Sequence, residues 1–395
     1  MKGDHVVFIQ DQREAEQFLR EVGADEAGVR WMKTKAVFRA VKLKDIPCPA
    51  ANIIKQEMLS KGGEAAVKRG TVSGQGTTDV LLLGTVKQYQ RLIKKLRMQP
   101  FGLKKIADEL SEMLKNIEGT GPTVMQLPRG QELVLGQRTL VMGILNVTPD
   151  SFSDGGHYYS FEAAVERALA IEEEGADILD IGGMSTRPGH APIPPEEELA
   201  RVLPVVEALA GRINIPISVD TYRATVARAC LEAGVGIIND VGGLLFDSEM
   251  AEVVAEFQAP VVVMHNRMPN RPPEGYRNLI DEMIEDLQVS LERAEQAGIP
   301  KKNIIIDPGA GFGKIGEENF VILKRLREFK SLGYPLLLGV SRKSFIGTAL
   351  NLPVEERLEG SLAAAVIGIL NGADIVRVHD VKATKRVATI ADAVK

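Results

Sequence analysis

The feature that most constrains this chain is an eightfold alternation, from residue 140 onward, of short apolar runs with longer segments of helical period. The apolar runs are LVMGILN from Leu140, DILDIGG from Asp177, PISVD from Pro216, VGIINDV from Val235, PVVVMH from Pro260, NIIIDPG from Asn303, YPLLLGVS from Tyr334 and DIVRVHD from Asp374. Such alternation is typical of βα units whose strands form a parallel sheet. Eight units in about 255 residues match a (β/α)8 barrel, whereas an open doubly wound sheet usually has about five to seven strands. We therefore predict an α/β chain with a TIM barrel and a second, smaller N-terminal α/β domain.

Polar side chains end almost every one of these runs. The endings are Asn146, Gly182–Gly183, Asp220, Asn239–Asp240, His265, Asp307, Ser341–Lys343 and Arg377–His379. Each residue by itself is explained as readily by a turn or a helix cap. In a barrel, however, functional groups gather at the C-terminal ends of the strands, so the whole set predicts a binding site on one rim.

The chemistry of these endings favours a flat heterocycle with an anionic group beside it. Asp220, Asn239, Asp307 and Lys343 supply two carboxylates, an amide and an ammonium, and a carboxylate accepts two parallel N–H bonds from a ring. Arg377 can stack on a ring or hold phosphate oxygens. The loops GGMSTRPGH and SRKSFIG offer hydroxyls, cations and backbone N–H groups to an anion. The stretch DPGAGFGK lacks the spacing of a nucleotide-binding P-loop.

Composition narrows the alternatives. The chain has 395 residues, is 45% hydrophobic and contains only two cysteines, which argues against a disulfide framework or a zinc cluster and favours a reducing, cytoplasmic location. No apolar run approaches the roughly 20 residues that span a bilayer, so we expect no membrane association. Residues 1–118 carry 21 Lys and Arg against 15 Asp and Glu. The basic stretch RLIKKLRM nevertheless has no interleaved aromatic residues, and we expect no binding to nucleic acid.

The first 118 residues have a small α/β pattern of their own. We expect strands at HVVFIQ, KAVFRAVKL and DVLLLG, and helices at Arg13–Val22, after Pro49, around Gln88–Arg97 and at Leu103–Ile117. Residues 119–126 read as a linker before a barrel at 127–395, and QELVLGQRTL as a hairpin that closes the lower end of the barrel. The role of the small domain is open, with an interaction or oligomerisation module as the expectation.

The motifs of the barrel resemble those of the dihydropteroate synthase family. They are GILNVTPDSFSDGG, GGMSTRPG, ISVDT, IINDV, DPGAGFGK, GVSRKS and RVHDV, and they follow in family order between about Leu127 and Lys395. The resemblance implies condensation of p-aminobenzoate with 6-hydroxymethyl-7,8-dihydropterin pyrophosphate, giving 7,8-dihydropteroate and pyrophosphate. It also implies a Mg²⁺ ion as cofactor, a homodimer built through barrel helices, and membership in the family that sulfonamides target.

The resemblance also implies roles for individual residues. The catalytic pterin pocket falls on Asp220, Asn239, Asp307, Lys343 and Arg377. The expected substrate-binding residues are Phe152, Asp154, Thr186, Arg187, Met264, Phe312, Ser344 and His379. Asn146 is the expected ligand of Mg²⁺.

Two positions depart from the family pattern, and two other functions stay open at this point. Met184 stands where many family members have Glu, and Ala310 where Phe is common. A pterin-binding barrel of the methyltransferase kind would share the fold but would not need the phosphate loops. A non-catalytic pterin-binding protein is the other alternative, for which Met184 would be the first sign.

Overall fold

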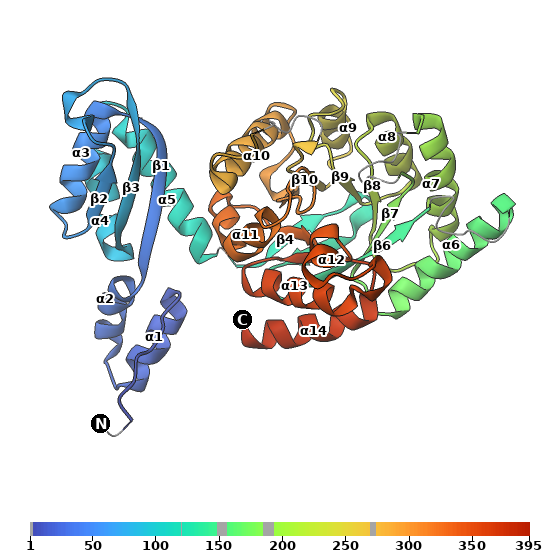
Figure 1. Cartoon of the computed structure of the whole chain (residues 1–395), viewed down its shortest axis with the longest axis horizontal. Coiled ribbons are helices and arrows are strands. Elements are labelled where there is room, and N and C mark those ends of the chain that lie inside the picture. Colours follow the sequence, from blue (N-terminus) through green and yellow to red (C-terminus); the bar gives the residue numbers. More distant parts are fainter. Residues whose placement is uncertain (1–2, 120, 148–155, 185–192, 269–273) are drawn as a thin grey trace. The chain divides into compact units, whose positions relative to one another are not determined.

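The computed structural model describes residues 3–119, 121–147, 156–184, 193–268 and 274–395, with the side chains of 156–160 left aside. Contacts divide the chain into two units, Met1–Thr120 and Gly121–Lys395 (Figure 1). Each unit has its own hydrophobic core. Among the described residues, no helix is both long and apolar enough to cross a membrane.

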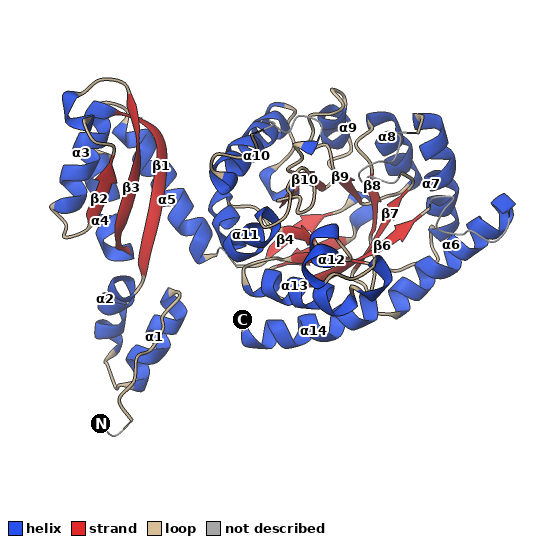
Figure 2. Ribbon diagram, in the orientation of Figure 1, coloured by secondary structure: helices blue, strands red, loops and turns tan. Residues whose placement is uncertain are grey.

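The C-terminal unit contains the predicted barrel of eight parallel strands (Figure 2). The strands are β6 (Leu140–Asn146), β7 (Ile178–Gly182), β8 (Ile217–Asp220), β9 (Ile237–Asp240), β10 (Val261–Met264), β11 (Ile304–Asp307), β12 (Leu337–Gly339) and β13 (Ile375–Val378). Neighbours along the chain pair with one another, and β13 pairs with β6. The ring closes between β11 and β12 through a single parallel bridge, Ile306 to Leu336. All eight predicted strands are thus confirmed.

Helices surround the ring of strands (Figure 1). They are α6 (Gly156–Glu173), α7 (Pro195–Leu209), α8 (Ala224–Ala233), α9 (Met250–Glu256), α10 (Leu279–Gln296), α11 (Glu318–Arg325), α12 (Ser344–Leu350), α13 (Leu358–Leu370) and α14 (Val381–Val394). Strand residues such as Leu179, Ile181 and Val263 belong to the outer core that these helices cover. Because side chains alternate across a strand, the residues between them point into the barrel.

The interior of the barrel therefore has two layers of different character. The lower layer is apolar and contains Leu140, Met142, Ile178, Ile237, Val262, Ile305, Leu337 and Ile375. Two residues further along, four of these strands place a polar side chain inward: Asp180, Asn239, Asp307 and Arg377. The equivalent positions of β6, β10 and β12 are Ile144, Met264 and Gly339, and β8 ends in Asp220. The five charged or amide side chains form a polar layer above the apolar one.

A hairpin seals the lower end of the barrel. Strands β4 (Thr123–Gln126) and β5 (Glu132–Leu135) pair antiparallel, and their side chains Met125, Leu127, Leu133 and Leu135 join the apolar lower layer. The hairpin was expected from QELVLGQRTL alone. It begins earlier, within the segment that we expected to be a linker, because Met125 is buried in the interior cluster.

The N-terminal unit is a three-stranded antiparallel sheet with helices on one face. Its strands, in spatial order β1-β3-β2, are β1 (Phe38–Pro47), β3 (Thr77–Thr85) and β2 (Glu64–Val67). Helices α3 (Cys48–Leu59), α4 (Val86–Leu96) and α5 (Leu103–Glu118) pack with the sheet in one core. A helical hairpin, α1 (Gln12–Glu21) and α2 (Glu26–Ala36), precedes the sheet.

One prediction for this unit is wrong, and two elements were missed. The run HVVFIQ forms no strand; Val6 and Phe8 are 79% and 82% exposed, because a β-prone segment without a neighbouring strand has nothing to pair with. Helix α2 was missed because its apolar face is short and its many polar residues obscure the helical period in the sequence. Strand β2 was missed because glycines flank it on both sides.

Candidate functional site

A buried network of charges links three strands in the polar layer of the barrel. Arg377 on β13 donates from Nε to Asp180 Oδ2, at 2.6 Å, and from Nη2 to Asp220 Oδ2, at 2.7 Å. Asp180 is fully buried and Asp220 nearly so. Within the part of the chain that the structure describes, the second oxygen of each carboxylate is buried without a hydrogen-bond partner. A buried carboxylate oxygen of this kind costs free energy unless a donor reaches it, so the two oxygens indicate where N–H groups of a ligand would bind.

Asn239 on β9 joins the same network. Its Nδ2 donates to Asp180 Oδ2 at 3.1 Å, and its backbone lies opposite Asp220 in the pairing of β8 with β9. The next residue, Asp240, accepts bonds from the backbone N–H groups of Gly242 and Leu244. Asp240 therefore shapes the loop that follows β9, and Asn239 is the member of this pair that joins the polar layer.

Asp307 enters the layer from β11, beside Met264 on β10. Its Oδ1 accepts the N–H of Gly309 at 2.7 Å. Gly309 has a φ of +64°, and a Cβ there would lie 2.2 Å from the carbonyl oxygen of His265, so only glycine fits this turn. The other oxygen, Oδ2, lies near β12: a Cβ built on Gly339 would be 4.0 Å from it and 3.9 Å from Arg377 Cβ. Asp307 and Arg377 thus flank the same space.

Lys343 and Phe312 form the next part of the rim. Lys343 Nζ lies 4.0 Å from the centroid of the Phe312 ring, which is within the range of a cation–π contact. The aliphatic part of Lys343 lies against Gly311, where an added Cβ would approach its Cδ to 3.1 Å. The ammonium and the aromatic ring therefore lie on the loops that follow β11 and β12, beside the space that Asp307 and Arg377 flank. This space, between Asp220, Asp307, Lys343 and Arg377, is the hollow of the candidate site.

Asn146 ends β6 beside the same hollow. A Cβ built on Gly182 would lie 3.7 Å from Asn146 Oδ1 and 3.9 Å from Asp220 Oδ2, so both oxygens face one small space. No group of three or more His, Cys, Asp or Glu side chains suited to a metal occurs within the described ranges. A metal here would take one or two side-chain oxygens from this chain and the rest of its ligands from elsewhere, as Mg²⁺ commonly does.

Burial shifts the ionisation of these groups. It raises the pKa of Asp220 to about 7, against the opposing effect of Arg377, and it raises the pKa of Asp307. Burial lowers the pKa of Lys343 to about 8, although Asp307 favours its charge. Burial also disfavours the charge of Arg377, but Asp180 and Asp220 outweigh it and raise the pKa of the guanidinium. The layer therefore combines a guanidinium that its neighbours keep charged with two carboxyl groups, Asp220 and Asp307, whose pKa values burial raises.

The remaining rim residues differ in their surroundings. His379 Nδ1 lies 3.0 Å from Ser341 Oγ, which connects the ends of β12 and β13. Ser344 is exposed at the first position of α12. Arg342 forms a bidentate ion pair with Asp380 through Nε and Nη2, and this contact joins the loops after β12 and β13. Ala310 is buried in the outer core.

His265, expected on the rim, is instead buried in a structural cluster. Its Nε2 lies 2.9 Å from Asp286 Oδ2, on α10, and its carbonyl oxygen accepts a bond from Lys314 Nζ. Lys314 also donates to the carbonyl oxygens of Pro308 and Gly309. Lys314 thereby holds the loops after β10 and β11 together.

The structure brings most of the predicted residues to one place, and it adds one that was missed. Asn146, Asp220, Asn239, Met264, Asp307, Phe312, Lys343 and Arg377 border the hollow. Asp180 was missed because only the last residues of each apolar run were considered, and it lies two residues before Gly182. Side chains alternate between the two faces of a strand, so Asp180 lies on the same face as Gly182, two residues later, and this alternation could have identified Asp180. The predicted residues Phe152, Asp154, Thr186 and Arg187 lie outside the described residues.

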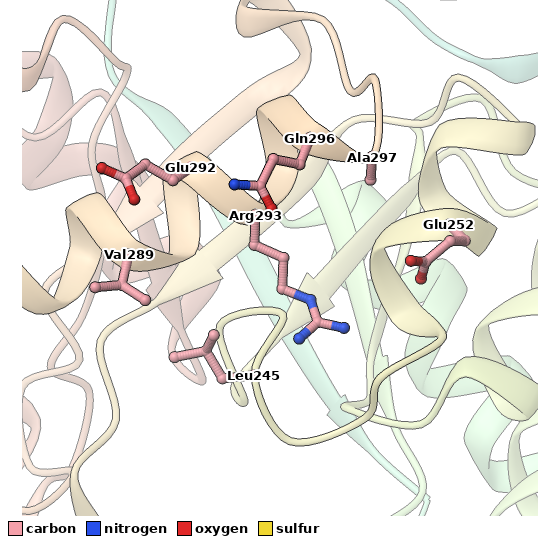
Figure 3. Close-up of a pocket in the computed structure, with 7 residues that line it drawn as sticks. All are labelled: Leu245, Glu252, Val289, Glu292, Arg293, Gln296 and Ala297. Carbon is pink, nitrogen blue, oxygen red and sulfur yellow. The ribbon is translucent and has the colours of Figure 1, made fainter.

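A separate surface pocket of about 380 Å³ lies between α9, α10 and the loop after β9 (Figure 3). Its lining residues are Leu245, Glu252, Val289, Glu292, Arg293, Gln296 and Ala297. Arg293 points toward the loop that carries Leu245 (Figure 3) and donates to the carbonyl oxygen of Ser248. None of the predicted site residues lines this pocket, and the convergence of buried polar groups makes the barrel rim the better candidate.

Comparison with known proteins gives one consistent result. The pattern that defines the family of pterin binding enzymes matches residues 142–379. The dihydropteroate synthase of Bacillus subtilis is 51% identical over 257 residues, which are 65% of this chain and 89% of that protein. A crystal structure of dihydropteroate synthase from Clostridium difficile, in the presence of pteroic acid, is 48% identical with a TM-score of 0.64. It covers 66% of this chain and 98% of that one.

A further relative extends the similarity into the N-terminal unit. A probable bifunctional folylpolyglutamate synthase/dihydropteroate synthase of Halobacterium salinarum is 42% identical over 390 residues. The alignment covers 98% of this chain and 46% of that protein. The N-terminal unit therefore also occurs in a larger protein of this kind.

The His265 cluster predicts a pH dependence of stability. Burial lowers the pKa of His265 from 6.5 to about 4, so the imidazole is neutral in the folded chain but takes up a proton in the unfolded chain. This contribution to stability is complete above pH 6.5 and is lost as the pH falls toward 4, by about 3 kcal/mol. We expect the free energy of unfolding of the barrel to fall less steeply over this range in His265→Gln than in the unsubstituted chain.

Urea unfolding followed by circular dichroism measures this slope, and fluorescence of Trp31, the single tryptophan, reports separately on the N-terminal unit. His5→Gln, which removes an exposed imidazole, is the control. Equal slopes for His265→Gln and the unsubstituted chain would contradict the assignment.

Proposed function

The chain belongs to the family of pterin binding enzymes, and we propose that it is a dihydropteroate synthase whose barrel rim binds a dihydropterin pyrophosphate and p-aminobenzoate. The observation that carries the proposal is the buried layer of Asp180, Asp220, Asn239, Asp307 and Arg377. The unpartnered oxygens of Asp180 and Asp220 suit the N–H groups of a pterin ring, because an ionised carboxylate oxygen can only accept hydrogen bonds. Curated relatives with this name match the barrel at 46–51% identity.

The same layer suits the chemistry of the reaction. When the bond between the pterin methylene and pyrophosphate breaks, its electron pair leaves with pyrophosphate, and positive charge spreads into the dihydropterin ring. Carboxylates fixed around the ring stabilise this charge without having to reorganise. The amino nitrogen of p-aminobenzoate then forms the new C–N bond and loses a proton to solvent. No strong base is needed, because the carbon it attacks is already electron-poor.

We assign the anionic and aromatic parts of the substrates to the outer rim. Arg377 and Lys343 supply positive charge beside the carboxylates, where a pyrophosphate group would leave. The Phe312 ring offers a face for p-aminobenzoate, and Ser344, exposed at the start of α12, offers a hydroxyl for its carboxylate. His379, bonded to Ser341, lies two residues beyond Arg377 and would approach the pyrophosphate. We keep Phe152, Asp154, Thr186 and Arg187 as loop contributions to the same site.

Release of pyrophosphate on mixing the two substrates with Mg²⁺ tests the function directly. A methyltransferase-type barrel or a non-catalytic pterin-binding protein would release none. Absence of release under conditions where the barrel is folded would overturn the proposal.

Asp307→Asn should weaken the binding of 6-hydroxymethylpterin by about 2 kcal/mol, close to thirtyfold, because a charge-assisted bond becomes a neutral one. Titration calorimetry measures the change. Asp177→Asn is the matched control: it removes a carboxylate that pairs with Arg138 and Lys385, at the opposite end of the barrel. An affinity of Asp307→Asn equal to that of the control would remove Asp307 from the pocket.

We propose that Mg²⁺ accompanies pyrophosphate and that Asn146 is its ligand from this chain. The carboxamide oxygen of Asn146, at the C-terminal end of β6, suits a hard cation that takes few protein ligands. When bound, the ion would neutralise charge on the leaving group. Asn146→Ala should reduce the gain in pyrophosphate affinity caused by Mg²⁺ by about tenfold, as measured by calorimetry at several Mg²⁺ concentrations. Asn278→Ala, on the surface at the start of α10, should leave the gain unchanged; an unchanged gain in Asn146→Ala would exclude the assignment.

We propose a homodimer formed through the outer face of α13. This helix has one charged residue, Glu359, and its outward residues Ile367 and Leu370 are exposed, as is Phe320 on neighbouring α11. An apolar outer face on a barrel helix is a common basis of a two-fold interface. Ile367→Asp should raise the dissociation constant at least about a hundredfold, as measured by light scattering over a dilution series. The control Val289→Asp, on α10, should dimerise normally; a dimeric Ile367→Asp would refute this interface.

A further inference from the structure

Asp180 holds two other members of the polar layer through one oxygen atom. Its Oδ2 accepts Arg377 Nε at 2.6 Å and Asn239 Nδ2 at 3.1 Å. Asp180 is completely buried and comes from β7, whereas its two partners come from β13 and β9. It therefore connects strands on both sides of its own, and solvent cannot replace it.

The bond to Asn239 fixes the orientation of an amide. An amide can turn by 180° about its last torsion, which exchanges its donor and acceptor ends at little cost in volume. A carboxylate can only accept, so the NH₂ end of Asn239 has to face Asp180. The carbonyl oxygen of Asn239 then lies on the opposite side. The reverse orientation would place two buried acceptors together, which is strongly unfavourable.

The bond to Arg377 fixes a guanidinium in the same way. Asp180 takes Nε and Asp220 takes Nη2, and two bonds from one planar group determine the plane in which it lies. The position of the remaining nitrogen, Nη1, is then determined as well. One buried carboxylate thus determines the order of donors and acceptors on Asn239 and the plane of the cation on Arg377.

We propose that Asp180 is a positioning residue that sets the pattern of donors and acceptors by which the barrel distinguishes a pterin from similar bicyclic rings. The inference rests on the proposed function for the identity of the ligand. A pterin and the corresponding lumazine have the same shape, but the lumazine carries a carbonyl oxygen in place of the 2-amino group. The neighbouring ring nitrogen is correspondingly changed from acceptor to donor. When the Asn239 amide is fixed, its donor and acceptor match the pattern of one ring and conflict with that of the other. An amide that is free to turn can form hydrogen bonds with either ring.

Asp180→Asn tests the proposal with little change of volume. An amide at position 180 can accept from or donate to Asn239, so Asn239 becomes free to turn. We expect the ratio of the affinities for 6-hydroxymethylpterin and 6-hydroxymethyllumazine to fall about tenfold, which is the effect of one hydrogen bond. We also expect kcat to fall with little change in the KM for p-aminobenzoate, because Arg377 loses one of its two anchors. The control Asp177→Asn, on the residue before β7, should keep the affinity ratio and kcat.

A second measurement uses the unsubstituted chain and decides the question if Asp180→Asn does not fold. In the nuclear magnetic resonance spectrum of protein labelled with ¹⁵N at asparagine, the side-chain NH₂ of Asn239 is identified by its absence from Asn239→Ser. We expect one of its protons to be protected from exchange with water in the ligand-free protein and to stay protected when 6-hydroxymethylpterin is added. Rapid exchange of both protons would overturn the proposal, as would an unchanged affinity ratio in a folded Asp180→Asn.

The two measurements also separate this inference from the proposed function. Protection of the Asn239 amide is measured without substrate, so it does not depend on whether the chain releases pyrophosphate. A chain that binds pterin with a protected amide but releases no pyrophosphate would contradict the function and support the role of Asp180. A chain that releases pyrophosphate normally but whose Asn239 amide exchanges rapidly would support the function and contradict the role of Asp180.

Discussion

Closure of eight parallel strands into a ring is the constraint on which the rest of the barrel depends. Once the ring closes at Ile306 and Leu336, every second side chain points to a confined interior and the others face the helices. The lower interior is filled by one apolar residue or more from almost every strand and sealed by the hairpin of β4 and β5. The charged residues Asp180, Asp220, Asp307 and Arg377 therefore lie toward the C-terminal ends of the strands, where Arg377 contacts both Asp180 and Asp220. The site is a consequence of this arrangement.

Burying so many charges would normally destabilise a core, and the contacts show how the cost is limited. The guanidinium of Arg377 is shared by two carboxylates, Asp180 and Asp220, so each carboxylate that loses water gains a charged donor. Asp307 accepts a backbone N–H instead. The compensation is incomplete, because one oxygen of Asp180 and one of Asp220 keep no partner. Buried polar atoms normally have hydrogen-bond partners, and functional sites are where exceptions to this rule are expected. A ligand that donates to these two oxygens would complete the network.

Much of this could be predicted from the sequence, and the exceptions have physical reasons. The strands were predictable because each is a short, largely apolar run between helical segments, and the rim was predictable because polar residues end the runs. Asp180 was not found because it lies inside a run, where its neighbours Leu179 and Ile181 make the segment look uniformly apolar. His265 ends a run but turns to Asp286 on α10, a contact between residues 21 positions apart that no local pattern indicates. HVVFIQ has the composition of a strand but no strand beside it.

The geometry also explains how one hollow can serve two opposite electrostatic demands. A ring that becomes cationic needs negative charge around it, whereas a departing pyrophosphate needs positive charge. In the proposed site Arg377 would meet both demands. Its Nε and Nη2 donate to Asp180 and Asp220, the carboxylates that would surround the ring, and these two bonds determine the position of its third nitrogen. Were the guanidinium anchored by Asp220 alone, it could rotate about that contact, and the cation would no longer be held at a fixed distance from both parts of the substrate. In the proposed mechanism, the buried carboxylate of Asp180, which contacts Asn239 and Arg377 through a single oxygen, would keep the guanidinium at a fixed position between the ring and the departing pyrophosphate.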